Sequence, residues 1–253
     1  MAAVPGAASV GVPATPAGVP APVVDSPASQ TVTIRTDVVE ATFDARGGDL
    51  VRMALLQQAD HNDKTRPTVL FDRSAERLYL AQTGLITPVP GASLPTHLTA
   101  MTVTSSEREL AAGSNELAVR FESAEVGGVK LVKTFTFKRG EYPIAVRHEV
   151  INGSGAPVEP QLYLQLVRDG NPPPGESKLY FTFTGPAIYT DKSKFTKIDF
   201  KDIERNRTTH DKEADNGWIA MVQHYFASAW LVSGNAPREF RTARVSDNKY
   251  SVA

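Results

Sequence analysis

Residues 217–232 read GWIAMVQHYFASAWLV and form the densest apolar stretch of the chain. The stretch contains both tryptophans and four aromatic rings within thirteen residues, Trp218, Tyr225, Phe226 and Trp230. Because an aromatic side chain buries roughly 150–250 Å², we expect these four rings to act as a structural anchor in the core. The first half also fits a helical face, whereas the second half alternates as in a strand. Bracketing glycines and the high aromatic content favour a strand.

Alternation of apolar and polar residues continues through the middle of the chain. Apolar residues occupy positions 117, 119 and 121, then positions 129, 131, 135 and 137, then positions 142, 144, 146 and 150, and finally positions 162, 164 and 166. Glycine-containing turn sequences separate most of these runs. The pattern predicts sequential antiparallel strands, each with one face toward solvent. The predicted fold class is therefore mainly β, with little helix.

Paired glycines mark the first turn of this predicted sheet. Gly47 and Gly48 follow a run in which Val39, Ala41 and Phe43 alternate. Since glycine readily takes positive φ, we interpret the pair as a structural turn between two strands. Residues 57–77 and 87–97 are polar or contain proline, and we interpret them as connections.

Composition excludes several classes of function. The 27 basic and 28 acidic residues give a net charge of −1, which offers no electrostatic reason to expect a nucleic-acid partner. The chain has no cysteine, and its five histidines show no metal-ligand spacing, so we predict no metal and no cofactor. We also predict no catalytic residues, because no catalytic motif is present. No apolar run approaches the roughly 18–20 residues that a membrane-spanning helix needs.

The N-terminal 29 residues differ from the rest. They hold six of the eighteen prolines, eight alanines and one charged residue, Asp25. Such a segment buries too little apolar area to offset its chain entropy. We therefore predict a disordered Pro/Ala-rich linker over residues 1–29 and a folded domain over residues 30–253.

Four segments, taken in order and spacing, resemble the large periplasmic domain of Gram-negative YidC-type membrane protein insertases. They are residues 36–50, with Gly47 and Gly48, residues 133–142, residues 185–189 and residues 217–230. No single segment is specific, but the four together span most of the chain. The resemblance implies a large antiparallel β-supersandwich of the mutarotase-like kind.

The resemblance also implies where such a protein works and with what. It implies the periplasmic face of the bacterial inner membrane, nascent membrane proteins as clients of the full-length protein, and the Sec translocon with its SecD and SecF subunits as partners. Family members carry a membrane anchor before this domain and membrane helices after it. We therefore expect a fragment without its membrane-spanning parts, with the β domain cut short at its C-terminus.

The charged segment 191–215 is the candidate docking surface. We expect Lys192, Lys194, Lys197 and Lys201 to contact a partner protein there, within the wider stretch 174–216. Two alternatives to a non-catalytic insertase domain remain, both from the sugar-recognising relatives of this fold class. One is a carbohydrate-binding β-sandwich, and the other is a sugar epimerase or lyase, which needs a convergent histidine and carboxylate.

Overall fold

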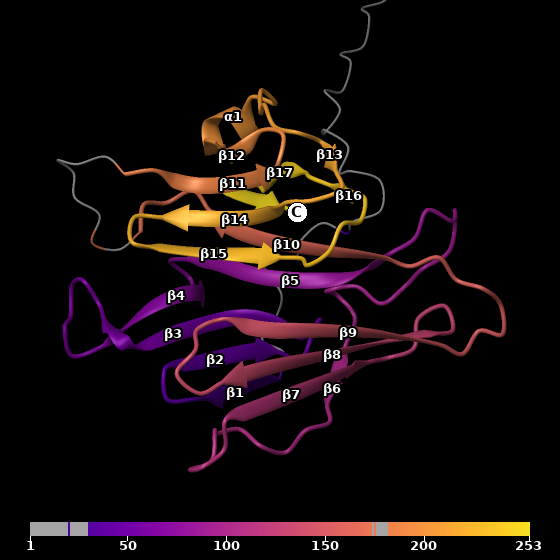
Figure 1. Cartoon of the computed structure of the whole chain (residues 1–253), viewed down its shortest axis with the longest axis horizontal. Coiled ribbons are helices and arrows are strands. Elements are labelled where there is room, and N and C mark those ends of the chain that lie inside the picture. The colour runs from indigo at the N-terminus through magenta and orange to yellow at the C-terminus, as the bar shows by residue number, and fades with distance from the viewer. Residues whose placement is uncertain (1–19, 21–29, 174, 176–181) are drawn as a thin grey trace, which may run out of the picture.

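The structure of the chain is a computed structural model that describes residues 20, 30–173, 175 and 182–253. The linker predicted over residues 1–29 lies outside the described residues, apart from position 20. The described part is built from antiparallel strands and, within those residues, has a single helix, α1 (Phe200–Glu204) (Figure 1). The prediction of a mainly β fold with little helix is confirmed.

Eight strands form the long sheet, in the order β1-β2-β3-β4-β5-β10-β18-β17. They are β1 (Thr31–Arg35), β2 (Val39–Asp44), β3 (Asp49–Ala59), β4 (Pro67–Arg73), β5 (Leu78–Ile86), β10 (Gln161–Asp169), β17 (Thr242–Ser246) and β18 (Lys249–Val252). The first five strands follow chain order, while β10 and β18 join them from far along the sequence. The end of β3 and all of β4 lie inside the predicted connection 57–77, so that interpretation is wrong for residues 57–59 and 67–73.

The second sheet, the meander sheet, contains the alternating runs found in the sequence. Its order is β6 (Met101–Val103), β7 (Glu116–Ser123), β8 (Val129–Lys138) and β9 (Ile144–Asn152). Leu117, Val119, Phe121, Phe135 and Phe137 are all buried on its inner face, as their period-2 spacing predicts.

The third sheet, the hairpin sheet, has the order β12 (Lys194–Lys197), β11 (Thr184–Thr190), β14 (Trp218–Gln223) and β15 (Phe226–Leu231). A small ladder of β13 (Glu213–Ala214) with β16 (Arg238–Glu239) lies nearby in Figure 1. Residues 217–232 are thus two strands of a hairpin, β14 and β15, joined by a turn at His224 and Tyr225.

The hairpin corrects the expectation of a four-ring core anchor. Tyr225 is 79% exposed because it lies at the turn, outside the packed layers. Trp218, Phe226 and Trp230 are half-buried. The buried residues of the hairpin are mostly aliphatic and lie in β14, for example Ile219 and Met221.

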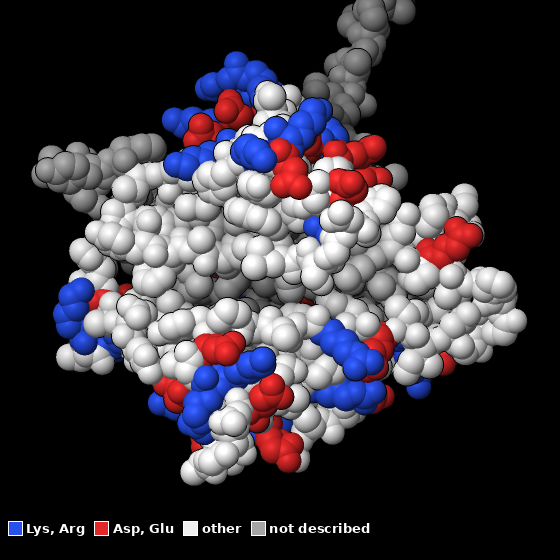
Figure 2. All heavy atoms as spheres, in the orientation of Figure 1, with Lys and Arg blue, Asp and Glu red and all other residues white. Residues whose placement is uncertain are grey.

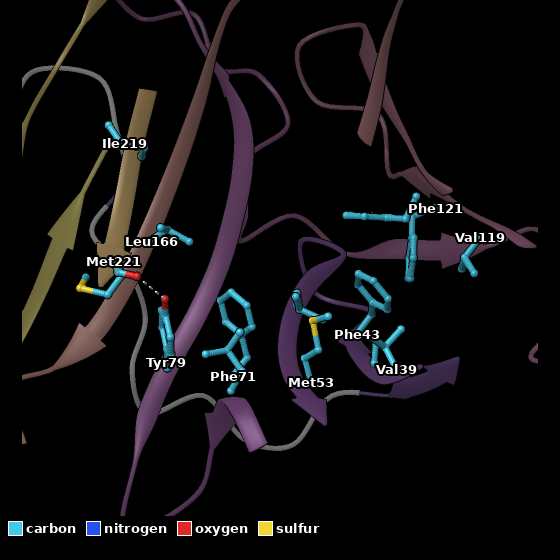
Figure 3. Packing of buried hydrophobic residues seen from close by; sticks show 14 of the residues in the cluster. Val39, Phe43, Met53, Phe71, Tyr79, Val119, Phe121, Leu166, Ile219 and Met221 are labelled. Carbon is cyan, nitrogen blue, oxygen red and sulfur yellow. Dashed lines mark hydrogen bonds between the residues drawn. The ribbon is translucent and has the colours of Figure 1, made fainter. Parts of the chain in front are cut away.

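The two smaller sheets cover different parts of the long sheet (Figure 1). The meander sheet packs on the β1–β3 end, where the rings of Phe43 and Phe135 have centroids 4.5 Å apart. The hairpin sheet packs on β5 and β10, where the hydroxyl of Tyr79 reaches Met221 and the indole of Trp230 reaches β10. Figure 3 shows the two packing regions side by side, with Met53 and Phe71 between them.

Gly47 and Gly48 join β2 to β3 with φ of +74° and +61°. A Cβ at Gly47 would collide with the carbonyl oxygen of His97. Only glycine fits both the positive φ and the close approach of this backbone.

Candidate functional site: an apolar cleft

A cleft of about 890 Å³ lies between the two smaller sheets. One wall is β15 of the hairpin sheet with the residues on either side of it, and the other is the first half of β9 of the meander sheet. Strands β3, β5 and β10 of the long sheet supply much of the floor. A space of this size is in the range of binding sites for small molecules and peptide side chains, roughly 300–1,000 Å³.

The lining of the cleft carries no charge among its described residues. Its apolar members include Leu50, Met53, Leu55, Leu70, Phe71, Phe135, Tyr142, Ile144, Val146, Leu162, Leu164, Leu166, Phe226, Trp230, Leu231 and Val232. The side-chain polar groups are few, chiefly Gln58, Thr83, His148, Ser228 and Ser233. The lack of charge is also visible on the surface: in Figure 2 an uncharged band separates the charged residues of the upper and lower parts of the molecule.

Several large apolar side chains at the cleft are exposed to solvent. Leu162 is 47% exposed, Leu231 72% and Tyr225 79%. Exposed apolar side chains that cluster, rather than scatter, indicate an interaction site. The cleft and its rim therefore form the candidate functional site.

His148 is the one imidazole among the residues that line the cleft. Its Nε2 lies 2.9 Å from the hydroxyl of Thr83, and it pairs across the ladder with Lys133 of β8. Burial, followed by the positive charge of Lys133, lowers the pKa of His148 to about 4. The ring is therefore neutral at neutral pH and contributes a polar contact without charge.

Beneath the floor lies a buried polar network. The fully buried Lys133 donates from Nζ to the carbonyl oxygens of Thr83 (2.7 Å) and Gly47 (2.5 Å). Asp49 accepts from the Nε2 of Gln82 at 2.6 Å. Burial raises the pKa of Asp49 and lowers the pKa of Lys133, because removal from water disfavours the charged form of each side chain. The network ties β8 to the β2–β3 turn and to β5.

The chemistry open to this cleft is limited by what lines it. A sugar epimerase or lyase needs a carboxylate beside the histidine, and none of the described lining residues is acidic. Within the described residues, histidine and carboxylate side chains form no group of three that could hold a metal ion. The site supports binding of apolar groups better than it supports acid–base chemistry.

The structure separates the predicted site residues into two places. Phe226, Trp230 and the exposed Tyr225 all line the cleft. Trp218, opposite Leu231 at the start of β14, instead stacks on Tyr189 with parallel rings 5.5 Å apart. Gly48 also borders the cleft, while Gly47 only shapes the turn beneath it.

The four lysines lie on consecutive elements at the far edge of the hairpin sheet. Lys192 is in the turn before β12, Lys194 is the first and Lys197 the last residue of that strand, and Lys201 is in α1. All four are exposed, and Figure 2 shows basic side chains gathered over this part of the molecule. Residues 174 and 176–181 of the wider predicted surface lie outside the described residues.

Sequence reasoning missed the cleft itself. Its residues alternate as core residues do, so a local pattern could not distinguish them from packed ones. The one usable signal was the excess of apolar residues in 226–232 that a single strand face could not bury.

Comparisons with known proteins bear on the whole chain. A family model described as the YidC periplasmic domain matches residues 31–253. The chain is 47% identical over 224 residues to a protein of Bordetella pertussis (strain Tohama I), covering 88% of this chain and 39% of that protein. It is 48% identical over 224 residues to a protein of Janthinobacterium sp. (strain Marseille), covering the same shares, 88% and 39%. A protein of Ralstonia nicotianae is 45% identical over 227 residues, covering 90% of this chain and 39% of that protein.

All three relatives carry the name "Membrane protein insertase YidC". The chain spans about two fifths of the length of these curated relatives. Among the described residues, no helix combines the length and apolar character needed to span a membrane.

Proposed function

This chain belongs to the YidC periplasmic-domain family, and from that premise we propose that its cleft transiently holds extended apolar segments of proteins entering the inner membrane. Family membership places the domain at the periplasmic face of that membrane. The proposed role is non-catalytic, the role of a chaperone module in the full-length insertase.

The observation that carries this proposal is the uncharged lining of the cleft. A membrane-bound client exposes apolar side chains, and burying a charged wall against them would cost several kcal/mol per charge. The described walls of this cleft bring no such penalty. The half-buried and exposed rings and leucines at its rim offer apolar contact without any prior rearrangement of the core.

The expected binding is weak. A leucine-sized side chain gains about 1.5–3 kcal/mol when it is fully buried. Association of two molecules costs at least about 4 kcal/mol in lost freedom. A few client side chains in the cleft therefore give reversible binding, which suits a segment that must move on into the membrane.

A matched pair of variants tests the proposal. Leu162 lines the cleft, Val89 does not, and each side chain is 47% exposed. We expect Leu162→Glu to weaken binding of a labelled peptide, in which valine or leucine alternates with threonine, by about tenfold. Val89→Glu adds the same charge elsewhere and should leave binding unchanged, with fluorescence anisotropy as the measurement. Equal binding by parent and Leu162→Glu would refute a role for the cleft.

The lysine edge of the hairpin sheet supports a second, independent proposal, contact with a protein partner such as the Sec accessory subunits. Lys192 makes a 3.5 Å ion pair with Asp211 while its own side chain stays 86% exposed. Mixed exposed charges add specificity and association rate more than affinity, so this contact should weaken with salt.

Site-specific crosslinkers test the lysine edge in the complete membrane-anchored protein. Positions 192, 197 and 201 should give adducts with Sec accessory subunits. Lys130, exposed on β8 of the meander sheet, is the control position. Adducts from position 130 alone would move the interface away from the lysine edge.

A further inference from the structure

Strand β15 is the last strand of the hairpin sheet, and within the described residues β14 is the only strand that pairs with it. The two-residue turn makes Gln223 and Phe226 a hydrogen-bonded pair, and such pairs alternate along an antiparallel ladder. Ser228 and Trp230 therefore also bond to β14. The backbone N–H and C=O groups of the other three residues of β15 point away from β14.

These three residues are Ala227, Ala229 and Leu231, and all three are exposed. Each offers one backbone donor and one acceptor. A strand lying alongside β15 could therefore form a regular ladder with this edge. An exposed row of this kind is a template for another strand, and proteins usually protect it.

The other edge strands of the described molecule carry such protection. β6 is only three residues long, and β12 has a lysine at each end, Lys194 and Lys197. β17 is interrupted by a bulge between Arg244 and Ser246. Short length, edge lysines and bulges each discourage strand pairing.

The strands of the small ladder, β13 and β16, have only two residues each. The last two edge strands of the larger sheets, β9 and β1, are protected by charge or by cover. β9 carries an ion pair of Arg147 with Glu149 at 2.9 Å. β1 is bridged at Arg35 by residues 108–110, whose backbone hydrogen-bonds to it. β15, with the sequence FASAWL, has six residues and no charge, proline or bulge.

An added strand would follow the mouth of the cleft, because every residue of β15 lines it. Alternate side chains of that strand would point to the face of β15 that carries Phe226, Ser228 and Trp230, where the indole of Trp230 already donates to the carbonyl oxygen of Gln165 in β10. The uncharged wall and floor select a segment with apolar side chains at those alternate positions. Resting on the proposed function, we propose that β15 binds an extended, uncharged client segment by adding it as a fifth strand of the hairpin sheet.

Backbone-modified peptides test this mode of binding without changing the protein. Three versions of the valine/leucine–threonine peptide share one sequence: unmodified, N-methylated on the residues of one alternating set, and N-methylated on the other set. We expect one methylated version to bind about tenfold more weakly, because it cannot donate to β15, and the other to bind like the unmodified peptide.

Amide hydrogen exchange, followed by NMR, provides a readout from the protein side. On peptide binding, the amides of Ala227, Ala229 and Leu231 should gain protection. Those of Ser228 and Trp230 should change little, because they already bond to β14. Protection without this alternation would overturn the added strand.

The outcomes separate this inference from the proposed function. Equal binding of all three peptides, together with weaker binding by Leu162→Glu, would keep the cleft and overturn strand addition. Failure of the unmodified peptide to bind would overturn both. Sedimentation equilibrium would detect concentration-dependent dimers. If Ala229→Lys abolished them and Ala118→Lys, at an exposed alanine on β7 away from the cleft, did not, a second copy of the chain would be the occupant and the client assignment would be overturned.

Discussion

The meander sheet covers the long sheet through phenylalanine rings, whereas the hairpin sheet covers it through a mixture of apolar and polar contacts. Phe43 of β2 lies against Phe121, Phe135 and Phe137, with centroids 4.5–6.3 Å apart, and all four rings are buried. On the hairpin side, Tyr79 and Trp230 hydrogen-bond across the layers.

This difference indicates that the two interfaces have different purposes. A cluster of buried rings gains stability from area and packing, and it tolerates no opening. The hairpin side leaves its outer strand half-buried and accessible along one edge. We expect the first interface to set the stability of the domain and the second to set its binding.

The largest expected effect is at the ring cluster. Phe43→Ala should lower the free energy of unfolding by about 3–5 kcal/mol, because it leaves a cavity among three packed rings. Urea denaturation followed by circular dichroism measures the loss. A cost below about 1 kcal/mol would show that the meander interface is not the stabilising one.

The hairpin side should respond less. Trp230→Ala should cost about 2 kcal/mol, since the ring is only half-buried but its Nε1 donates to the carbonyl oxygen of Gln165 at 3.1 Å. Trp230→Phe, which keeps a ring and removes the donor, should cost about 1 kcal/mol. If Trp230→Ala were as costly as Phe43→Ala under the same denaturation, the two interfaces would be equivalent.

A pH titration sharpens the comparison at the meander wall of the cleft. Because the pKa of His148 is held at about 4 in the folded protein, the unfolded chain takes up a proton there first as the pH falls below about 6.5. Stability from this group is present at neutral pH and is lost as the pH falls from about 6.5 toward 4. His148→Gln should make the acid-induced loss shallower by about 1–2 kcal/mol.

Asp49 has the opposite effect on the pH dependence of stability, because burial raises its pKa. It is present in both the parent protein and the His148→Gln variant. Lys133, the charged neighbour of His148, is likewise unchanged. The difference between parent and His148→Gln therefore reports His148. Parallel stability curves from pH 7 to pH 4 would contradict the assignment.

The smallest expected effect on stability is at the hairpin turn. Tyr225→Ala should change the free energy of unfolding by less than about 0.5 kcal/mol, because the side chain is 79% exposed. The same variant should weaken binding of the apolar peptide, since Tyr225 lines the cleft. Loss of stability without loss of binding would reverse the roles assigned to the two interfaces.

Sequence reasoning predicted much of the fold from local alternation. The strands around Leu117, Phe121 and Phe135 follow directly from a period of two and one buried face. The order of the long sheet could not be predicted in this way, because β10 pairs with β5 and β18 across long stretches of chain that leave no local trace. β4 was missed because Pro67 and flanking polar residues resemble a connection.

The cleft was unpredictable for a related reason. The same alternation in the sequence includes Leu162, Leu164 and Leu166. Leu166 is nevertheless buried, whereas Leu162 lies at the cleft mouth and is 47% exposed. Their difference depends on how far the covering sheets extend, which is a property of tertiary packing. The family resemblance reached the periplasmic-domain assignment, but the lining residues could only be found from the structure.

The position of β18 has a consequence for how the domain folds. This strand lies between β10 and β17 in the long sheet, with Val252 opposite Leu166. Until residues 249–252 have been synthesised and can pair, β10 keeps one edge unpaired. Pairings between segments this distant in sequence are slow to form, in the range of milliseconds to seconds for β-rich domains. The long sheet is therefore completed late, and the edge of β10 stays unpaired while residues 170–248 are added.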